Sequence, residues 1–223
     1  MTSIMVEPPG MDLKTFSSLL VDRLRDAWME VRRQRPHETF YVFGIETDSD
    51  ITDLNPLCNT EEEYAAQGGT SELRVSRWIG SPNEDSRLYR AGSEYTDELA
   101  SQLNEFVFEE LDRSNPRLAR RRKKQLLRIF ERALVDLDKR DFFGSGKTRH
   151  GVLLKIEFVD PDDAEWRQML KVIRRINPRQ SRAEFFRAIK AEMKEALKVR
   201  GEKSNSSPRR SISQGAESGF RCV

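Results

Sequence analysis

The sequence predicts an α+β domain in which helices pack on a mostly antiparallel sheet of about four strands. Stretches with apolar residues three or four positions apart alternate with short aromatic or β-branched runs, in the order α-β-β-β-α-α-β-α-α. At 223 residues the chain is long enough for one ordinary core. We expect a single domain over residues 12–200, between disordered segments at 1–11 and 201–223.

The first elements have the clearest signals. A helix is expected from Leu13 until Pro36, because the residue before proline disfavours the helical conformation. Residues 39–47, TFYVFGIET, are aromatic or β-branched on both faces, which is typical of a central strand. Three further strands are expected over 51–59, 73–79 and 150–159.

The later helices are indicated by capping residues and by the breaks between them. A proline after Asn115 separates two helices, the second of which ends near Lys139. Helix starts are expected at Thr60 with Glu63, at Thr96, at Asp160-Pro161 and at Ser181 with Glu184.

Residues 141–148, DFFGSGKT, resemble half of a phosphate-binding loop. Gly146-Lys147-Thr148 match its end, but Asp141 stands where the first glycine belongs. A phosphate-binding loop connects a buried strand to a helix, whereas here we expect a helix, then the glycines, then a strand. The stretch is therefore interpreted as a helix stop and not as the loop of a P-loop NTPase.

The charge is divided unequally along the chain. Residues 1–116 hold 11 Lys/Arg against 23 Asp/Glu, and residues 117–223 hold 28 against 14. The two halves either neutralise each other in one fold, which we favour, or the basic half has an anionic partner.

The sequence shows no catalytic or cofactor-binding constellation. The histidines are His37 and His150, and the cysteines are Cys58 and Cys222, so no metal site and no cofactor are expected. Cys58 is interpreted as a buried small residue, although a nucleophile paired with His150 stays open. The longest apolar runs are too short for a membrane span, and a reducing cytoplasm is expected.

A basic run at residues 117–128, RLARRRKKQLLR, is the strongest electrostatic feature. It opens a helix, where cations are unfavourable, so we expect these cations to have partners. One interpretation is pairing with the acidic helix near Glu105 or with another protein. The alternative is nucleic-acid binding through Arg120, Arg121, Arg122, Lys123 and Lys124.

Several stretches together resemble a bacterial family, the domain-of-unknown-function family numbered 4303. They are TFYVFGIETD at 39–48, CNTEEEY at 58–64, DFFGSGKTRHGVLLKIEFVDPDD at 141–163 and RRINPR at 174–179. This chain departs from the family by lacking a second tryptophan near 81–89. The resemblance implies no established reaction. Small bacterial domains of this kind sometimes serve as immunity or accessory proteins to toxins, which is an analogy of class only.

The leading hypothesis is a non-enzymatic cytoplasmic domain that binds another protein, as an immunity-type or accessory domain. We expect exposed residues to form the partner-binding surface, namely Asn59, Thr60, Glu61, the 80–92 loop, Lys147, Arg149 and His150. Nucleic-acid binding is the alternative, and a hydrolase or transferase using Cys58, His150 or nearby carboxylates is a third hypothesis.

Overall fold

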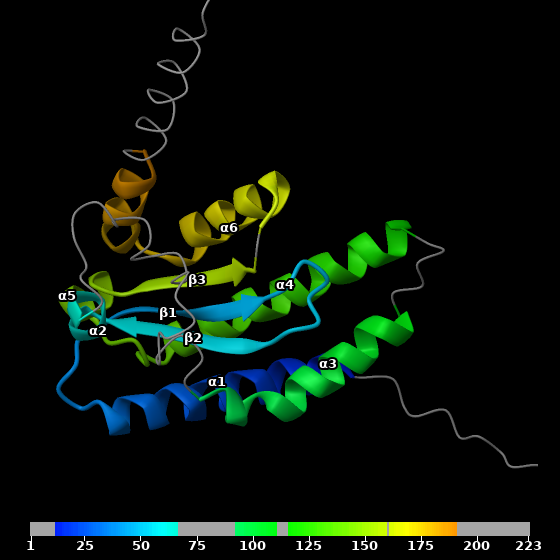
Figure 1. The fold of residues 1–223 in the computed structure, drawn as a ribbon, viewed down its shortest axis with the longest axis horizontal. Helices are drawn as coiled ribbons and strands as arrows, with labels where there is room; N and C mark the ends of the chain where they lie inside the picture. The colour runs from blue at the N-terminus through cyan, green and yellow to red at the C-terminus, as the bar shows by residue number, and fades with distance from the viewer. Residues whose placement is uncertain (1–11, 67–91, 111–115, 160, 191–223) are drawn as a thin grey trace, which may run out of the picture.

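Three strands form one mixed sheet in the residues that the structure describes. The computed structural model describes residues 12–66, 92–110, 116–159 and 161–190. Strand β1 (Phe40–Thr47) lies in the middle of the sheet (Figure 1). It pairs with β2 (Asn55–Thr60) in antiparallel and with β3 (Leu153–Phe158) in parallel. The prediction of an α+β fold is confirmed.

The expectation of about four mostly antiparallel strands is wrong for this sheet, which has three strands and one pair of each kind. Between β2 and β3 the chain passes through helices α2 (Glu61–Ala66), α3 (Asp97–Glu110) and α4 (Pro116–Lys139). Parallel pairing requires a long crossover of this sort, and the crossover returns β3 in the direction of β1. The strand expected over 73–79 lies outside the described residues.

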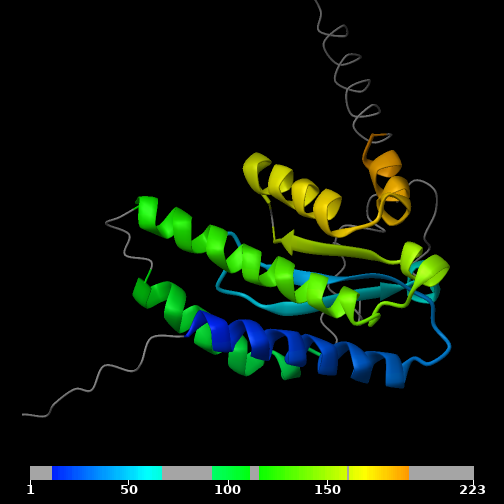
Figure 2. The ribbon, with the colours of Figure 1, turned by 180° about the vertical axis from the view of Figure 1, so that it is seen from behind.

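Helices cover both faces of the sheet. On one face α1 (Leu13–Gln34), α3 and α4 pack on Phe43 and Ile45 of β1 in the main core (Figure 2). On the other face a helix over 179–190 packs on Tyr41 and Leu153 in a smaller cluster. Helix α6 (Asp163–Ile176) lies beside β3 and contributes to both clusters.

A β-bulge at Tyr41 explains why two consecutive residues of β1, Tyr41 and Val42, belong to the same cluster. Phe40 is opposite Thr60, but Val42 is opposite Asn59, so Tyr41 is the extra residue. The bulge puts Phe40 and Phe43 on the same face, where their ring centroids are 5.3 Å apart. Tyr41 and Val42 consequently belong to the smaller cluster.

Several helix starts differ from expectation. The last described helix begins at residue 179, so Ser181 lies within its first turn and is not its N-cap. Helix α6 begins at Asp163 with Asp162 as its N-cap in a capping box with Glu165, and not at Asp160-Pro161. The capping box satisfies backbone N–H groups that the first turn of a helix leaves unpaired. A short helix, α5 (Gly146–His150), occupies residues expected to lead directly into a strand, so β3 begins only at Leu153.

The stretch 141–148 belongs to the packing of the core. The prediction that a helix and not a strand precedes it is confirmed, because α4 ends at Lys139. Phe143 is buried, and its ring centroid lies 5.6 Å from that of Trp28. The two phenylalanines of DFFG therefore close the main core beneath α1.

Candidate anion-binding groove

A groove of about 1080 Å³ lies between α1 and α4. The two helices lie side by side and run in the same direction on the face of the molecule seen in Figure 2. The α1 side of the groove comes from residues in its first ten positions, Leu13 to Asp22, and the α4 side comes from residues between Arg121 and Arg140.

Six exposed cations line this groove. They are Lys14, Arg121, Lys124, Arg128, Arg132 and Arg140. The four from Arg121 to Arg132 are three or four residues apart and so form one stripe along α4. At 1.5 Å per residue the stripe with Arg140 is about 28 Å long. The groove therefore presents an extended positive surface.

The acids of the groove do not neutralise these cations. Asp22 is bonded to Arg25, with 3.3 Å between Oδ1 and Nη1, and Asp136 is bonded to Lys139, with 3.8 Å between Oδ1 and Nζ. In the part of the chain that the structure describes, none of the six groove cations makes an ion pair. Neighbouring cations on α4 repel each other by roughly 0.2–0.5 kcal/mol per pair. The groove is therefore able to bind an anion.

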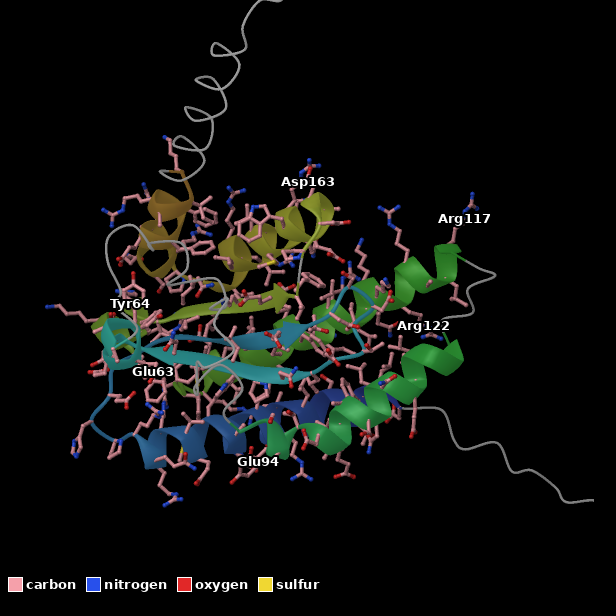
Figure 3. The ribbon with its side chains drawn as sticks, viewed as in Figure 1. Glu63, Tyr64, Glu94, Arg117, Arg122 and Asp163 are labelled. Carbon is pink, nitrogen blue, oxygen red and sulfur yellow. The ribbon has the colours of Figure 1, made fainter. Side chains whose placement is uncertain are left out.

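The structure divides the five residues of the nucleic-acid prediction between two sides of α4. Arg121 and Lys124 line the groove, and Arg120 is exposed beside it. Arg122 turns toward α3, with its guanidinium carbon 5.8 Å from the ring centroid of Phe106 (Figure 3). Lys123 Nζ donates to Asp50 Oδ1 at 2.6 Å and to the carbonyl oxygen of Ser49 at 2.9 Å. The expected neutralisation between the two halves of the chain is thus seen at Lys123 but not in the groove.

Residues 20–178 match the family described as "Domain of unknown function (DUF4303)". The chain belongs to the DUF4303 family. No curated protein and no solved structure matches the chain. The family match includes the five groove cations from Arg121 to Arg140, whereas Lys14 lies before it. None of the described helices is long and apolar enough to cross a membrane.

In the DUF4303 chain, two of the stretches that carry the family resemblance, 141–163 and 174–179, meet at Arg149. This arginine is only 6% exposed. Its Nε donates to Asp138 Oδ1, and its Nη1 donates to the carbonyl oxygen of Val152 at 2.7 Å. Weaker bonds of 3.4 Å lead to Ser181 Oγ and Asn177 Oδ1. Arg149 therefore joins the end of α4 to the start of β3 and to the segment after α6.

Asn177, from the stretch RRINPR, covers the outer edge of β3. Its side chain accepts from the Leu154 N–H and donates to the Leu154 carbonyl oxygen, both at 2.7 Å. The same amide nitrogen donates to the Ile173 carbonyl oxygen at 3.1 Å. An edge strand otherwise leaves backbone groups unpaired. The family motif at 174–179 thus has a structural role in the DUF4303 chain.

Two of the segments expected to bind a partner, residues 59–61 and residues 147–150, lie at the same end of the sheet. They do so because the end of β2 and the start of β3 both lie beside the start of β1. Thr60 is 0% exposed and donates from Oγ1 to Glu38 Oε2 at 2.6 Å. The expectation that Thr60 and Arg149 are exposed is therefore wrong. Lys147 and His150 are exposed on α5, and Asn59 and Glu61 are half-buried. Of the 80–92 loop, residues 80–91 lie outside the described residues, and Gly92 is buried.

Cys58 is buried in the structure and is not available as a nucleophile. It is 0% exposed in β2, and burial raises the pKa of its thiol to about 12. Only the thiolate is nucleophilic, and a thiol with this pKa stays protonated at neutral pH. The interpretation of Cys58 as a buried small residue is confirmed.

Sequence reasoning did not identify a buried charged cluster on β1 and β3. Lys155 and Glu157 are 2% and 3% exposed, and the Lys155 ammonium is bonded to Glu157 Oε2. Glu46 is opposite Glu157 in the parallel pair, and it accepts from Asn55 Nδ2 at 3.4 Å. The Asn55–Glu46 bond joins β2 to β1, whereas the Lys155–Glu157 pair lies within β3. The three charged side chains are buried, so a ligand in solution does not reach them.

The groove also contains residues that sequence reasoning missed. Arg132 continues the spacing of Lys124 and Arg128 along α4, and Arg140 follows eight residues later. The helical period could have provided this signal. Lys14 carried no such signal, because only the packing of α1 beside α4 places it there.

Proposed function

We propose that this chain is a non-catalytic binding domain that recognises an acidic surface of another protein through the α1–α4 groove. The observation that carries the proposal is the set of six exposed cations, none of which has an ion-pair partner in the described residues. The groove's own two acids are bonded to cations outside it. Such a surface attracts anionic partners and speeds their association.

The lining of the groove favours a protein over a nucleic acid. Leu13, Val21 and Ile129 contribute apolar surface, and the residues that line the groove include no aromatic side chain on which a base could stack. Nucleic-acid binding stays a second candidate, because the row of cations on α4 has the length and charge to follow a phosphate backbone.

The proposal also includes a bacterial and cytoplasmic setting and an immunity-type or accessory role. They come from the analogy of class that the family resemblance implied. An immunity-type role requires a tight, non-catalytic complex with one protein. The exposed residues Lys147 and His150, with Asn59 and Glu61, form a second candidate contact surface at the end of the sheet.

The proposal is tested by capturing partners from lysate with and without nuclease. The groove variant carries Arg121→Glu, Lys124→Glu and Arg128→Glu. The matched control carries Lys171→Glu, Arg187→Glu and Lys190→Glu, which reverse three exposed cations that lie outside α4 and do not line the groove. Both variants have the same net charge, so non-specific attraction falls equally in both.

We expect one nuclease-resistant protein that the wild type and the control capture and the groove variant does not. The purified partner should then bind with an affinity that falls as salt rises. Recovery of nucleic acid that nuclease removes would replace the proposal with the second candidate. Equal loss in both variants would show that the groove is not the site.

A further inference from the structure

The groove has apolar side chains at its bottom and cations along its edges. Val21 and Ile129 are almost fully buried and Leu13 is half-buried, so these apolar side chains lie deeper than the exposed cations around them. A ligand that reaches the bottom of the groove therefore meets apolar surface, and its flanks meet positive charge.

The two helices that form the groove also define the shape of its occupant. Packed helices have axes about 8–10 Å apart, and the depression between two of them accepts a third helix, as in helical bundles. The cation stripe of about 28 Å corresponds to about 19 residues of helix. Its cations from Arg121 to Arg132 repeat every three or four residues, which is also the repeat of side chains on one face of a partner helix.

We propose that the groove binds an amphipathic acidic helix of the partner protein, an inference that rests on the proposed function. The apolar stripe of this helix lies on Leu13, Val21 and Ile129. Its Asp and Glu residues, spaced at i, i+3, i+4 and i+7, pair with the cations of α4. This is recognition of a helix in a groove by apolar anchors and flanking charges.

The test separates helical recognition from charge alone. The probe is a capped, fluorescently labelled peptide of about 18 residues, built from Glu, Leu and Ala with the acids and leucines at helical spacing. One control peptide has the same composition in scrambled order. A second is the first peptide with proline at its centre, which breaks the helix. Duplex and single-stranded DNA oligonucleotides of the same charge complete the set.

Affinities are measured by fluorescence anisotropy with the full chain. We expect the amphipathic peptide to bind at least about tenfold more tightly than the scrambled and the proline peptides, because only it presents both stripes together. Leu13→Ser should weaken the amphipathic peptide by about tenfold and leave the scrambled peptide unchanged. Leu19→Ser is the matched control, since Leu19 is an exposed leucine of α1 that does not line the groove.

The other outcomes would overturn either the helical occupant alone or the proposed function as well. Equal binding of the amphipathic and the scrambled peptides, or no effect of Leu13→Ser, would overturn the helical occupant and leave recognition of an acidic protein standing. Failure of every acidic peptide, while the groove variant still loses its captured partner, would do the same. Tighter binding of DNA than of any peptide would overturn both this inference and the proposed function.

Discussion

Two sets of cations in the second half of the chain have opposite surroundings. Arg149 is buried and bonded to Asp138, to a backbone carbonyl oxygen and to two polar side chains. The groove cations from Arg121 to Arg140 are exposed and have no ion-pair partner in the described residues. A buried charge loses its hydration and so requires a paired group, whereas exposed like charges stay hydrated and can remain unpaired. Arg149 therefore stabilises the fold, and the groove cations are available for a ligand.

Removing Arg149 should have the largest effect on stability. Arg149→Ala leaves the Asp138 carboxylate without its partner, and we expect the free energy of unfolding to fall by about 3–5 kcal/mol. Chemical denaturation followed by circular dichroism measures this change. The matched control is Arg175→Ala, because Arg175 is an exposed arginine bonded to Glu131, and its loss should cost about 0–1 kcal/mol. Equal losses would contradict the assigned difference in burial.

Asn177→Ala should destabilise the protein next most strongly. The substitution leaves the N–H and carbonyl groups of Leu154 unpaired at the buried edge of β3. At about 1–2 kcal/mol for each of these two groups, the lower part of the usual range for a buried group that loses its partner, we expect roughly 2–4 kcal/mol in total. Hydrogen exchange should show faster exchange of the Leu154 amide. Asn177→Asp keeps the acceptor for that amide, so an amide exchanging as fast as in Asn177→Ala would argue against the assigned bond.

The helices of the fold could be predicted well from sequence, for a physical reason. Helix α1 was expected from Leu13 and begins there, because its capping and its apolar spacing are local properties of the chain. Helix α4 was likewise expected between Pro116 and Lys139, and it has these bounds. The parallel pairing of β3 with β1 could not be predicted, since it depends on the path of the helices between the strands and not on the strand's own residues.

The candidate site was predictable in part. The basic run at 117–128 pointed to α4, and two of the five predicted residues, Arg121 and Lys124, line the groove. The burial of Arg149 could not be predicted, because arginine is almost always exposed unless a buried partner is present. Asp138, eleven residues earlier, is that partner, and only the turn through Phe143 brings the two together.

Neutralising a groove cation should stabilise the protein while weakening partner binding. Arg128 lies four residues from both Lys124 and Arg132, so Arg128→Gln removes two like-charge pairs, and Gln forms helices about as well as Arg. We expect the free energy of unfolding to rise by about 0.4–1 kcal/mol. Thermal denaturation at low salt measures the gain. The control Arg33→Gln removes a cation bonded to Glu30 and should lower stability slightly. A loss of stability in Arg128→Gln would indicate an internal partner for Arg128.

Lys123 is the intermediate case, since it belongs to the basic run but is bonded to Asp50. Its side chain is 34% exposed, and an ion pair of this kind contributes about 0.2–1 kcal/mol. Lys123→Ala should therefore reduce stability by that amount and leave capture of the partner unchanged. Denaturation and the capture experiment measure both. A loss of binding equal to that of the groove variant would show that the ligand also contacts the other side of α4.

The smallest expected effect is on the pKa of Glu30, which is paired with Arg33 on α1. Arg33 is exposed but paired, in contrast to Lys14 on the same helix. Arg33 donates to both carboxylate oxygens of Glu30, at 2.8 and 2.6 Å, and these bonds lower the pKa of Glu30 from 4.5 to about 2. Because the folded pKa is depressed, the stabilisation is complete above pH 4.5 and is lost as the pH falls toward 2. Carboxyl-carbon NMR titration measures this pKa directly. Arg33→Gln should return it toward 4.5, and Arg25→Gln, which removes a cation bonded to Asp22 and Asp26, should not change it. A wild-type value near 4.5 would mean that Arg33 is not paired with Glu30 in solution. The contrast between paired and unpaired cations would then rest on Arg149, Lys123 and Arg175.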